Sequence, residues 1–207
     1  MILSMKSSLG YDRTVTYHHG DLRRTLLAQT ASAIAEDGVA RLSMRALAKR
    51  AGVSNAAPTY HFGDKAGLLT ALAAEGFDLL AEAMTGTAEE QGLVARGVAY
   101  VEFALKCPSH FTVMFQPRLL HDDDPELTAA RQRAWAALSV GVAEVRSGPD
   151  GDFGVASWSL VHGYATLVLS GAVEPDDALK QARAVAAHLV PEADGRTRAG
   201  QTGAGRP

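Results

Sequence analysis

Two short amphipathic segments joined by a glycine turn constrain this chain more than any other feature of its sequence. In the first, Ser43 is a residue type that caps helices, and apolar residues follow it on one helical face, namely Met44, Leu47, Ala48 and Ala51. Gly52 comes next, where a left-handed residue commonly ends a helix. The second segment carries Pro58 and ends near Phe62. Two brief helices joined in this way predict a helix-turn-helix unit, with an ordinary hairpin in an all-α core as the alternative.

The second segment of this pair would present the side chains that read DNA. We expect Ser54 or Asn55 to cap it, with Pro58 in its first turn, where a missing N–H is tolerated. In a helix-turn-helix unit the second helix lies in the major groove. The side chains that would then face DNA are Asn55, Thr59, Tyr60 and His61.

The residue pattern of this region resembles the DNA-binding domain of the TetR family of bacterial transcriptional regulators. The resemblance covers residues 17–75 and rests on Gly38, Ser43, Arg45, Leu47, Ala48, Ala51, Gly52, Val53, Ser54, Tyr60, His61, Phe62, Lys65 and Leu68. It implies DNA contacts from Ser43, Arg45, Ser54, Asn55, Ala56, Thr59, Tyr60, His61 and Lys65, with Lys65 beside a phosphate. Many members carry an aromatic residue where this chain has Thr59. Whether Thr59 or the following Tyr60 makes the main contact therefore stays open.

Composition favours an all-α protein. Hydrophobic residues make up 47% of the 207 positions, Ala and Leu dominate, and no alternating strand pattern is present. The single Cys107 excludes an internal disulfide and a four-thiolate zinc site, which favours a reducing compartment. We therefore expect a cytoplasmic protein. The TetR resemblance implies that it is nucleoid-associated and has about nine helices.

The charge of the chain is divided unevenly along its length. Residues 17–65 carry seven Arg/Lys against four Asp/Glu, whereas residues 66–190 carry eight against sixteen. The positive part coincides with the predicted helix-turn-helix unit. A basic head on an acidic body is the electrostatic pattern expected of a DNA-binding protein, because phosphate contacts supply most sequence-independent affinity.

The chain divides into four expected regions. Residues 1–16 form a flexible arm, 17–66 a three-helix DNA-binding domain, 67–190 a helical bundle for ligand binding and dimerisation, and 191–207 a disordered tail. We expect helices at 20–37, at 65–84 with Asp64 as cap, at 89–106, around 111–115, and at 125–146, 153–173 and 175–189, besides the helix-turn-helix pair. The 65–84 helix would join the DNA-binding head to the body.

Neither a metal site nor an active site is expected. His121 and the three aspartates after it could suggest a metal, but consecutive carboxylates do not converge on one ion without a dedicated loop, so a solvated loop and helix cap is favoured. His18 and His19 are adjacent and have no third ligand near them. No nucleophile has an identifiable base, so we expect no enzyme and no cofactor.

Residues 153–173 contain no charged side chain, which raises the question of a membrane span. Polar residues interrupt the stretch and both flanks are acidic, so a buried helix is the better interpretation. One face would meet the core and the other a second copy of the chain. The expected homodimer contacts are Gly163, Ala165, Leu167, Gly171, Leu179 and Val185. The run from Trp158 to Gly163 also resembles a Trp-His-Gly signature found in the C-terminal domain of one TetR subgroup.

The TetR resemblance implies a regulator whose body binds a small, hydrophobic effector. Residues that could line a pocket are Tyr100, Phe103, Cys107, Phe111, Met114, Phe115, Trp135, Trp158 and His162, although each is also an ordinary core residue. The implied function is a homodimeric repressor that binds a pseudo-palindromic operator in double-stranded DNA and leaves it when the effector binds. The alternative is a helical small-molecule binding or scaffolding protein without DNA binding.

Overall fold

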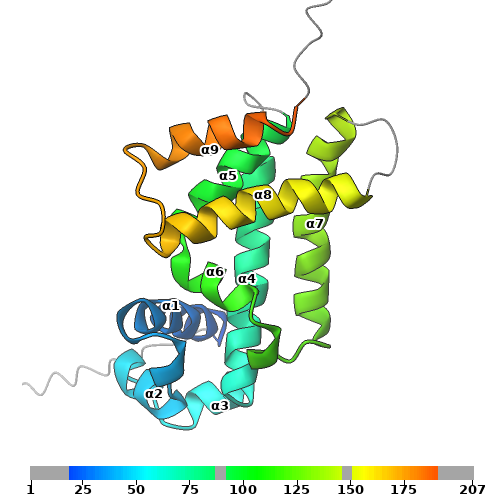
Figure 1. Cartoon of the computed structure of the whole chain (residues 1–207). Coiled ribbons are helices and arrows are strands. Elements are labelled where there is room, and N and C mark those ends of the chain that lie inside the picture. Colours follow the sequence, from blue (N-terminus) through cyan, green and yellow to red (C-terminus); the bar gives the residue numbers. More distant parts are fainter. Residues whose placement is uncertain (1–18, 87–91, 146–150, 191–207) are drawn as a thin grey trace, which may run out of the picture.

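The computed structural model describes residues 19–86, 92–145 and 151–190, and these residues form helices and no strands (Figure 1). The all-α prediction is therefore confirmed. The α-helices are α1 (His19–Asp37), α2 (Met44–Ala51), α3 (Ala57–Phe62), α4 (Lys65–Thr85), α5 (Leu93–Lys106), α6 (Pro108–Met114), α7 (Pro125–Val145), α8 (Gly151–Leu169) and α9 (Ala178–Ala187). Two 3-10 turns, η1 (Val39–Arg41) and η2 (Pro117–Leu119), connect some of them. The arm and tail expected at 1–16 and 191–207 lie outside the described residues.

The head of the molecule consists of α1, α2 and α3, which gather at one end of α4 (Figure 1). The Ser43 hydroxyl accepts the Ala46 N–H at 3.2 Å, as a helix cap does. Gly52 ends α2 with a φ of 67°, the left-handed conformation that glycine adopts without strain. Both features agree with the sequence prediction.

The start of α3 differs from the prediction. Neither Ser54 nor Asn55 caps the helix; its N-cap is Ala56, which makes no side-chain hydrogen bond to it. The reason is a preceding turn in which the Ser54 carbonyl accepts the N–H of Ala57 at 3.0 Å. Ser54 and Asn55 belong to this turn, so they lie before the position of the helix cap. Pro58 then falls in the first helical turn.

The long helix α4 passes from the head into the body (Figure 1). Asp64 caps it by accepting the Gly67 N–H at 2.7 Å. Leu68, Leu69, Leu72 and Leu80 are all almost fully buried, so apolar residues occupy more than one face. The helix packs along α7 over much of its length and also contacts α5 and α6.

The rest of the body is formed by α5 packed between α4 and the pair α8 and α9, while α8 crosses α7 (Figure 1). The Tyr164 hydroxyl donates to the Ala178 carbonyl at 3.1 Å, which fixes α8 to the start of α9. One face of α8 carries exposed apolar side chains, with Val155 51% and Leu167 46% exposed. Among the described helices, α8 included, none is both long and apolar enough to span a bilayer.

Candidate functional site

The outer surface of α3 and the turn before it carries side chains of the kind that contact DNA. Ser54, Asn55, Ala56 and Thr59 are exposed, and Tyr60 is 78% exposed. Pro58 and Phe62 of the same helix are buried, so the open Tyr60 marks the side of α3 that faces away from the head. His61 is half-buried, and its ring meets that of Tyr60 edge-on at 5.3 Å between centroids. The opposite face holds α3 to the head through buried Phe62.

The predicted contacts on α2 and α4 have different surroundings. Arg45 is exposed on α2, whereas the Ser43 hydroxyl is committed to its cap. The half-buried Lys65 donates from Nζ to the carbonyls of Val39 at 2.9 Å and Ala40 at 3.5 Å. Its ammonium therefore fastens η1 to the first turn of α4, a structural role that the sequence did not predict.

Further polar contacts hold the start of α4 to the loop before α7. The His121 N–H donates to Thr70 Oγ1 at 2.9 Å, and His121 Nε2 lies 3.1 Å from Asp64 Oδ1. The Gly67 N–H, followed by His121, lowers the pKa of Asp64 below its usual value. The loop also contains Asp124, which accepts the Leu127 N–H at 2.9 Å and so caps α7, as expected from the sequence. The described residues contain no group of three or more potential metal ligands.

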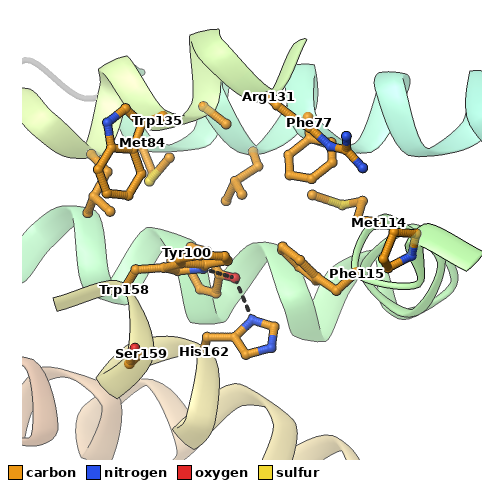
Figure 2. Close-up of a pocket in the computed structure, with 14 residues that line it drawn as sticks. Phe77, Met84, Tyr100, Met114, Phe115, Arg131, Trp135, Trp158, Ser159 and His162 are labelled. Carbon is orange, nitrogen blue, oxygen red and sulfur yellow. Dashed lines mark hydrogen bonds between the residues drawn. The ribbon is translucent and has the colours of Figure 1, made fainter. Parts of the chain in front are cut away.

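A cavity of about 570 Å³, partly open to solvent, lies in the body (Figure 2). Its wall is mainly apolar and aromatic, and it is formed by parts of α4, α5, α6, η2, α7 and α8. The lining residues are Phe77, Leu80, Met84, Tyr100, Met114, Phe115, Pro117, Arg131, Ala134, Trp135, Leu138, Trp158, Ser159 and His162. A volume of this size accommodates a drug-sized molecule.

Three side chains of the cavity wall form a hydrogen-bonded series. The Trp158 Nε1–H donates to the Tyr100 hydroxyl at 3.1 Å, and that hydroxyl lies 2.8 Å from His162 Nδ1 (Figure 2). Burial lowers the pKa of His162 and raises the pKa of Tyr100, so both are neutral near pH 7. We assign the Tyr100 proton to the bond with Nδ1, because Trp158 already donates to the oxygen. The His162 proton then resides on Nε2.

The cavity brings together only part of the predicted pocket. Tyr100, Met114, Phe115, Trp135, Trp158 and His162 line it, and Phe103, Cys107 and Phe111 do not. Phe111 packs behind the wall, with its ring 5.1 Å from that of His162. Cys107 is half-buried, and burial raises the pKa of its thiol, which makes it less reactive than an exposed cysteine.

The sequence prediction missed the contributions of α4 and most of those of α7. Phe77 lies four residues after Ala73, and Met84 lies four residues after Leu80, so helical spacing puts them on the same buried face of α4. It gave no sign that this face borders a cavity. Arg131 was missed because an arginine on a helix is expected to lie at the protein surface.

The residues predicted to form a dimer contact differ in their exposure to solvent. A Cβ placed on Gly163 would meet no atom within 4 Å, and Leu167 and Gly171 are exposed. Leu179 and Val185 are half-buried. Ala165 is fully buried within the chain, so it has no exposed surface for a contact with a second copy.

Comparisons with known proteins give the same division of the chain. Residues 26–72 match the model of bacterial regulatory proteins of the tetR family, and residues 93–191 match the model of a tetracyclin repressor-like C-terminal domain. No curated protein sequence matches the chain.

Solved structures resemble the whole fold. A protein of unknown function from Rhodococcus sp. RHA1 is 32% identical, with a TM-score of 0.69 over 84% of this chain and 96% of that one. The TetR family regulator PfmR from Thermus thermophilus is 22% identical, with a TM-score of 0.62 over 84% and 99%. LfrR from Mycobacterium smegmatis, a TetR-like regulator solved with proflavine, is 22% identical, with a TM-score of 0.60 over 81% and 93%.

An exposed recognition-type helix on a compact head, joined to a helical body, defines a DNA-binding transcriptional regulator rather than an enzyme. The chain belongs to the TetR family of transcriptional regulators.

Proposed function

We propose that the protein is a homodimeric repressor that leaves a two-fold symmetric operator when a small apolar molecule enters the cavity. One observation carries the proposal: α4 begins three residues after α3 ends and also forms part of the cavity wall through Phe77, Leu80 and Met84. A ligand that displaces these side chains therefore acts on the helix that positions the DNA-contacting surface.

The geometry of DNA makes such a displacement effective. The two α3 helices of a dimer must enter major grooves ~34 Å apart, so a tilt that changes their separation by a few ångströms lowers affinity. With 21 residues and a rise of ~1.5 Å each, α4 is roughly 30 Å long. A small rotation at the cavity therefore becomes a larger movement at the head.

The exposed apolar side of α8 supports a dimer. Val155 and Leu167 are 51% and 46% exposed on α8, and large apolar residues left exposed on a helix commonly mark an interface. If α8 and α9 of one chain packed against α8 and α9 of a second copy around a two-fold axis, the four helices would form a closed contact.

The regulatory ligand is proposed by analogy with neighbours of the same fold. LfrR was solved with proflavine, and the multidrug binding protein EbrR with imidazole. In this chain the support is the aromatic cavity itself, whose few polar groups, such as the Tyr100 hydroxyl, would orient a bound molecule.

Selection of bound duplexes from a random DNA pool tests the proposal. We expect an inverted repeat whose half-sites lie one helical turn apart or a multiple, and a mass of two chains in light scattering. Arg45→Glu and Tyr60→Ala should each weaken operator binding at least 10-fold, whereas Lys106→Glu, a matched charge reversal in the body, should not. Recovery of no common sequence, or equal losses in all three variants, would refute the proposal.

A further inference from the structure

Arg131 is the one residue with a formal charge among those that line the cavity, since His162 is neutral there. Its guanidinium carbon lies 5.8 Å from the centre of the Phe77 ring, in a cation–π contact on the cavity wall (Figure 2). None of the described residues that line the cavity has a carboxylate. A positive group on an otherwise apolar wall favours an anionic ligand over a cationic one, because opposite charges attract and like charges repel.

The present partner of Arg131 is Asp122, whose Oδ1 lies 2.8 Å from Nη1. The Asp122 side chain is 61% exposed and that of Arg131 is 32% exposed. Ion pairs with this much solvent access contribute little net stability. A carboxylate held inside the cavity by its apolar part can therefore replace Asp122 at the guanidinium.

Asp122 belongs to the loop that is bonded to the start of α4. The preceding residue, His121, donates its N–H to Thr70 and contacts the Asp64 carboxylate that caps α4. α3 ends at Phe62, two residues before this cap. The Arg131–Asp122 pair is thus joined through the backbone, from Asp122 to the adjacent His121, to the contacts that His121 makes where the DNA-contacting helix meets α4.

We propose that the effector is an apolar molecule bearing a carboxylate, that this carboxylate pairs with Arg131 in place of Asp122, and that loss of the Asp122 pair removes one of the contacts that position the 120–124 loop against the start of α4. This inference rests on the proposed function, because it names the chemical class of the effector and the route of its action. It assigns Arg131 as the residue that determines specificity. Asp122 competes with the carboxylate of the effector for the Arg131 guanidinium.

The two tryptophans of the chain provide the reporter. Trp135 and Trp158 are the only tryptophans in the sequence, and both line the cavity, so their fluorescence responds to occupancy. We would titrate the purified protein with decanoate, decan-1-ol and decylamine, which share an apolar chain and differ in the head group. The expected order of affinity is decanoate first, by at least 10-fold, and decylamine last.

Substitution of Arg131 tests the role of its charge. Arg131→Gln should lower decanoate affinity about 10-fold to the level of decan-1-ol and leave the alcohol unchanged, and Arg131→Lys should retain part of the preference. Arg133→Gln is the matched control, because Arg133 also lies on α7 and pairs with a carboxylate, Asp78 on α4, at 2.7 Å, but does not line the cavity. Its decanoate affinity should equal that of the unmodified protein.

Asp122→Asn should raise the decanoate affinity, whereas Arg131→Gln should lower it. With the competitor neutralised, decanoate should bind several-fold more tightly while decan-1-ol is unaffected, and operator binding without ligand should weaken several-fold. Because Asp122 is exposed, this variant remains folded even if Arg131→Gln does not.

The outcomes separate the two proposals. Equal affinity for all three decyl compounds, or an unchanged decanoate affinity in Asp122→Asn, would overturn the carboxylate inference and leave the cavity as a ligand site. If none of the three compounds changes tryptophan fluorescence, both the inference and the proposed effector role of the cavity are wrong, and operator binding is then judged by the DNA selection alone.

Discussion

The two ends of α4 differ in the kind of interaction that holds them. At the end next to the head, Asp64 accepts a hydrogen bond from the first turn of the helix, Lys65 donates one to η1, and Thr70 accepts one from the 120–124 loop. At the other end, Phe77, Leu80 and Met84 present flexible or aromatic side chains to the cavity. Hydrogen bonds fix one geometry, whereas apolar packing beside a cavity adjusts to different occupants. The position of α4 is therefore fixed by hydrogen bonds near the DNA-contacting surface, whereas its packing near the cavity can adjust to a ligand.

Two glycines of α4 provide the largest test of this difference. A Cβ on Gly67 would overlap the carbonyl oxygen of Phe62, a backbone atom, whereas a Cβ on Gly76 would come 2.6 Å from the flexible Met114 Sδ. We expect Gly67→Ala to lower the free energy of unfolding by about 3 kcal/mol. Gly76→Ala should change it by no more than about 1 kcal/mol, because better helix propensity offsets a side-chain shift. Urea denaturation followed by circular dichroism measures both, and similar losses would show that the two ends are equally rigid.

Removal of the Tyr100 hydroxyl tests the polar part of the cavity. Tyr100→Phe leaves the Trp158 Nε1–H and His162 Nδ1 without their shared partner. The free energy of unfolding should fall by about 2 kcal/mol, since unpaired buried polar groups carry a desolvation penalty. Tyr60→Phe at the exposed surface is the control, with no change in stability expected. An equal loss in both variants would show that the cavity network contributes nothing specific.

Substitution of Thr70 sharpens the comparison at the other end of α4. Thr70→Val preserves shape and removes the hydroxyl that accepts the His121 N–H, at a site that is 3% exposed. We expect a loss of about 1 kcal/mol in the free energy of unfolding. Hydrogen exchange in the cavity half of α4 should stay slow, while the His121 amide should exchange faster. An unchanged exchange rate at His121 would show that this bond does not hold the loop.

Acidification tests the environment of His162 and gives the smallest effect. Burial lowers the pKa of this ring in the folded protein, so below its usual value near 6.5 the unfolded chain binds the proton more readily. The free energy of unfolding should therefore fall as the pH drops from 7 to 5. In His162→Gln that decrease should be shallower, which thermal unfolding at several pH values measures. Parallel pH profiles for the two proteins would contradict the buried, neutral state of His162.

The sequence predicted those features that depend on a few neighbouring residues. The Ser43 cap, the left-handed Gly52 and the Asp64 cap each require one residue type at one position, and the structure contains all three. The cap of α3 was predicted wrongly because a turn and a helix cap place similar demands on Ser54. Local pattern alone does not separate these two uses of a serine.

The cavity was less accessible to prediction because it depends on how distant helices pack. Periodicity places Phe103 and Phe111 on buried faces as surely as it places Tyr100, yet only Tyr100 reaches the cavity. Similarly, nothing local indicates that Arg131 turns inward over Phe77 and pairs with Asp122 across the start of α7. These relations follow from the angles between α4, α5 and α7.

A single titration tests most directly whether α4 couples the cavity to the DNA-contacting surface. Labelled operator duplex bound to the protein is titrated with a molecule that enters the cavity, while DNA anisotropy and tryptophan fluorescence are recorded in the same sample. We expect the DNA to dissociate over the concentration range in which Trp135 and Trp158 report occupancy. A cavity that saturates while the operator stays fully bound would contradict the coupling.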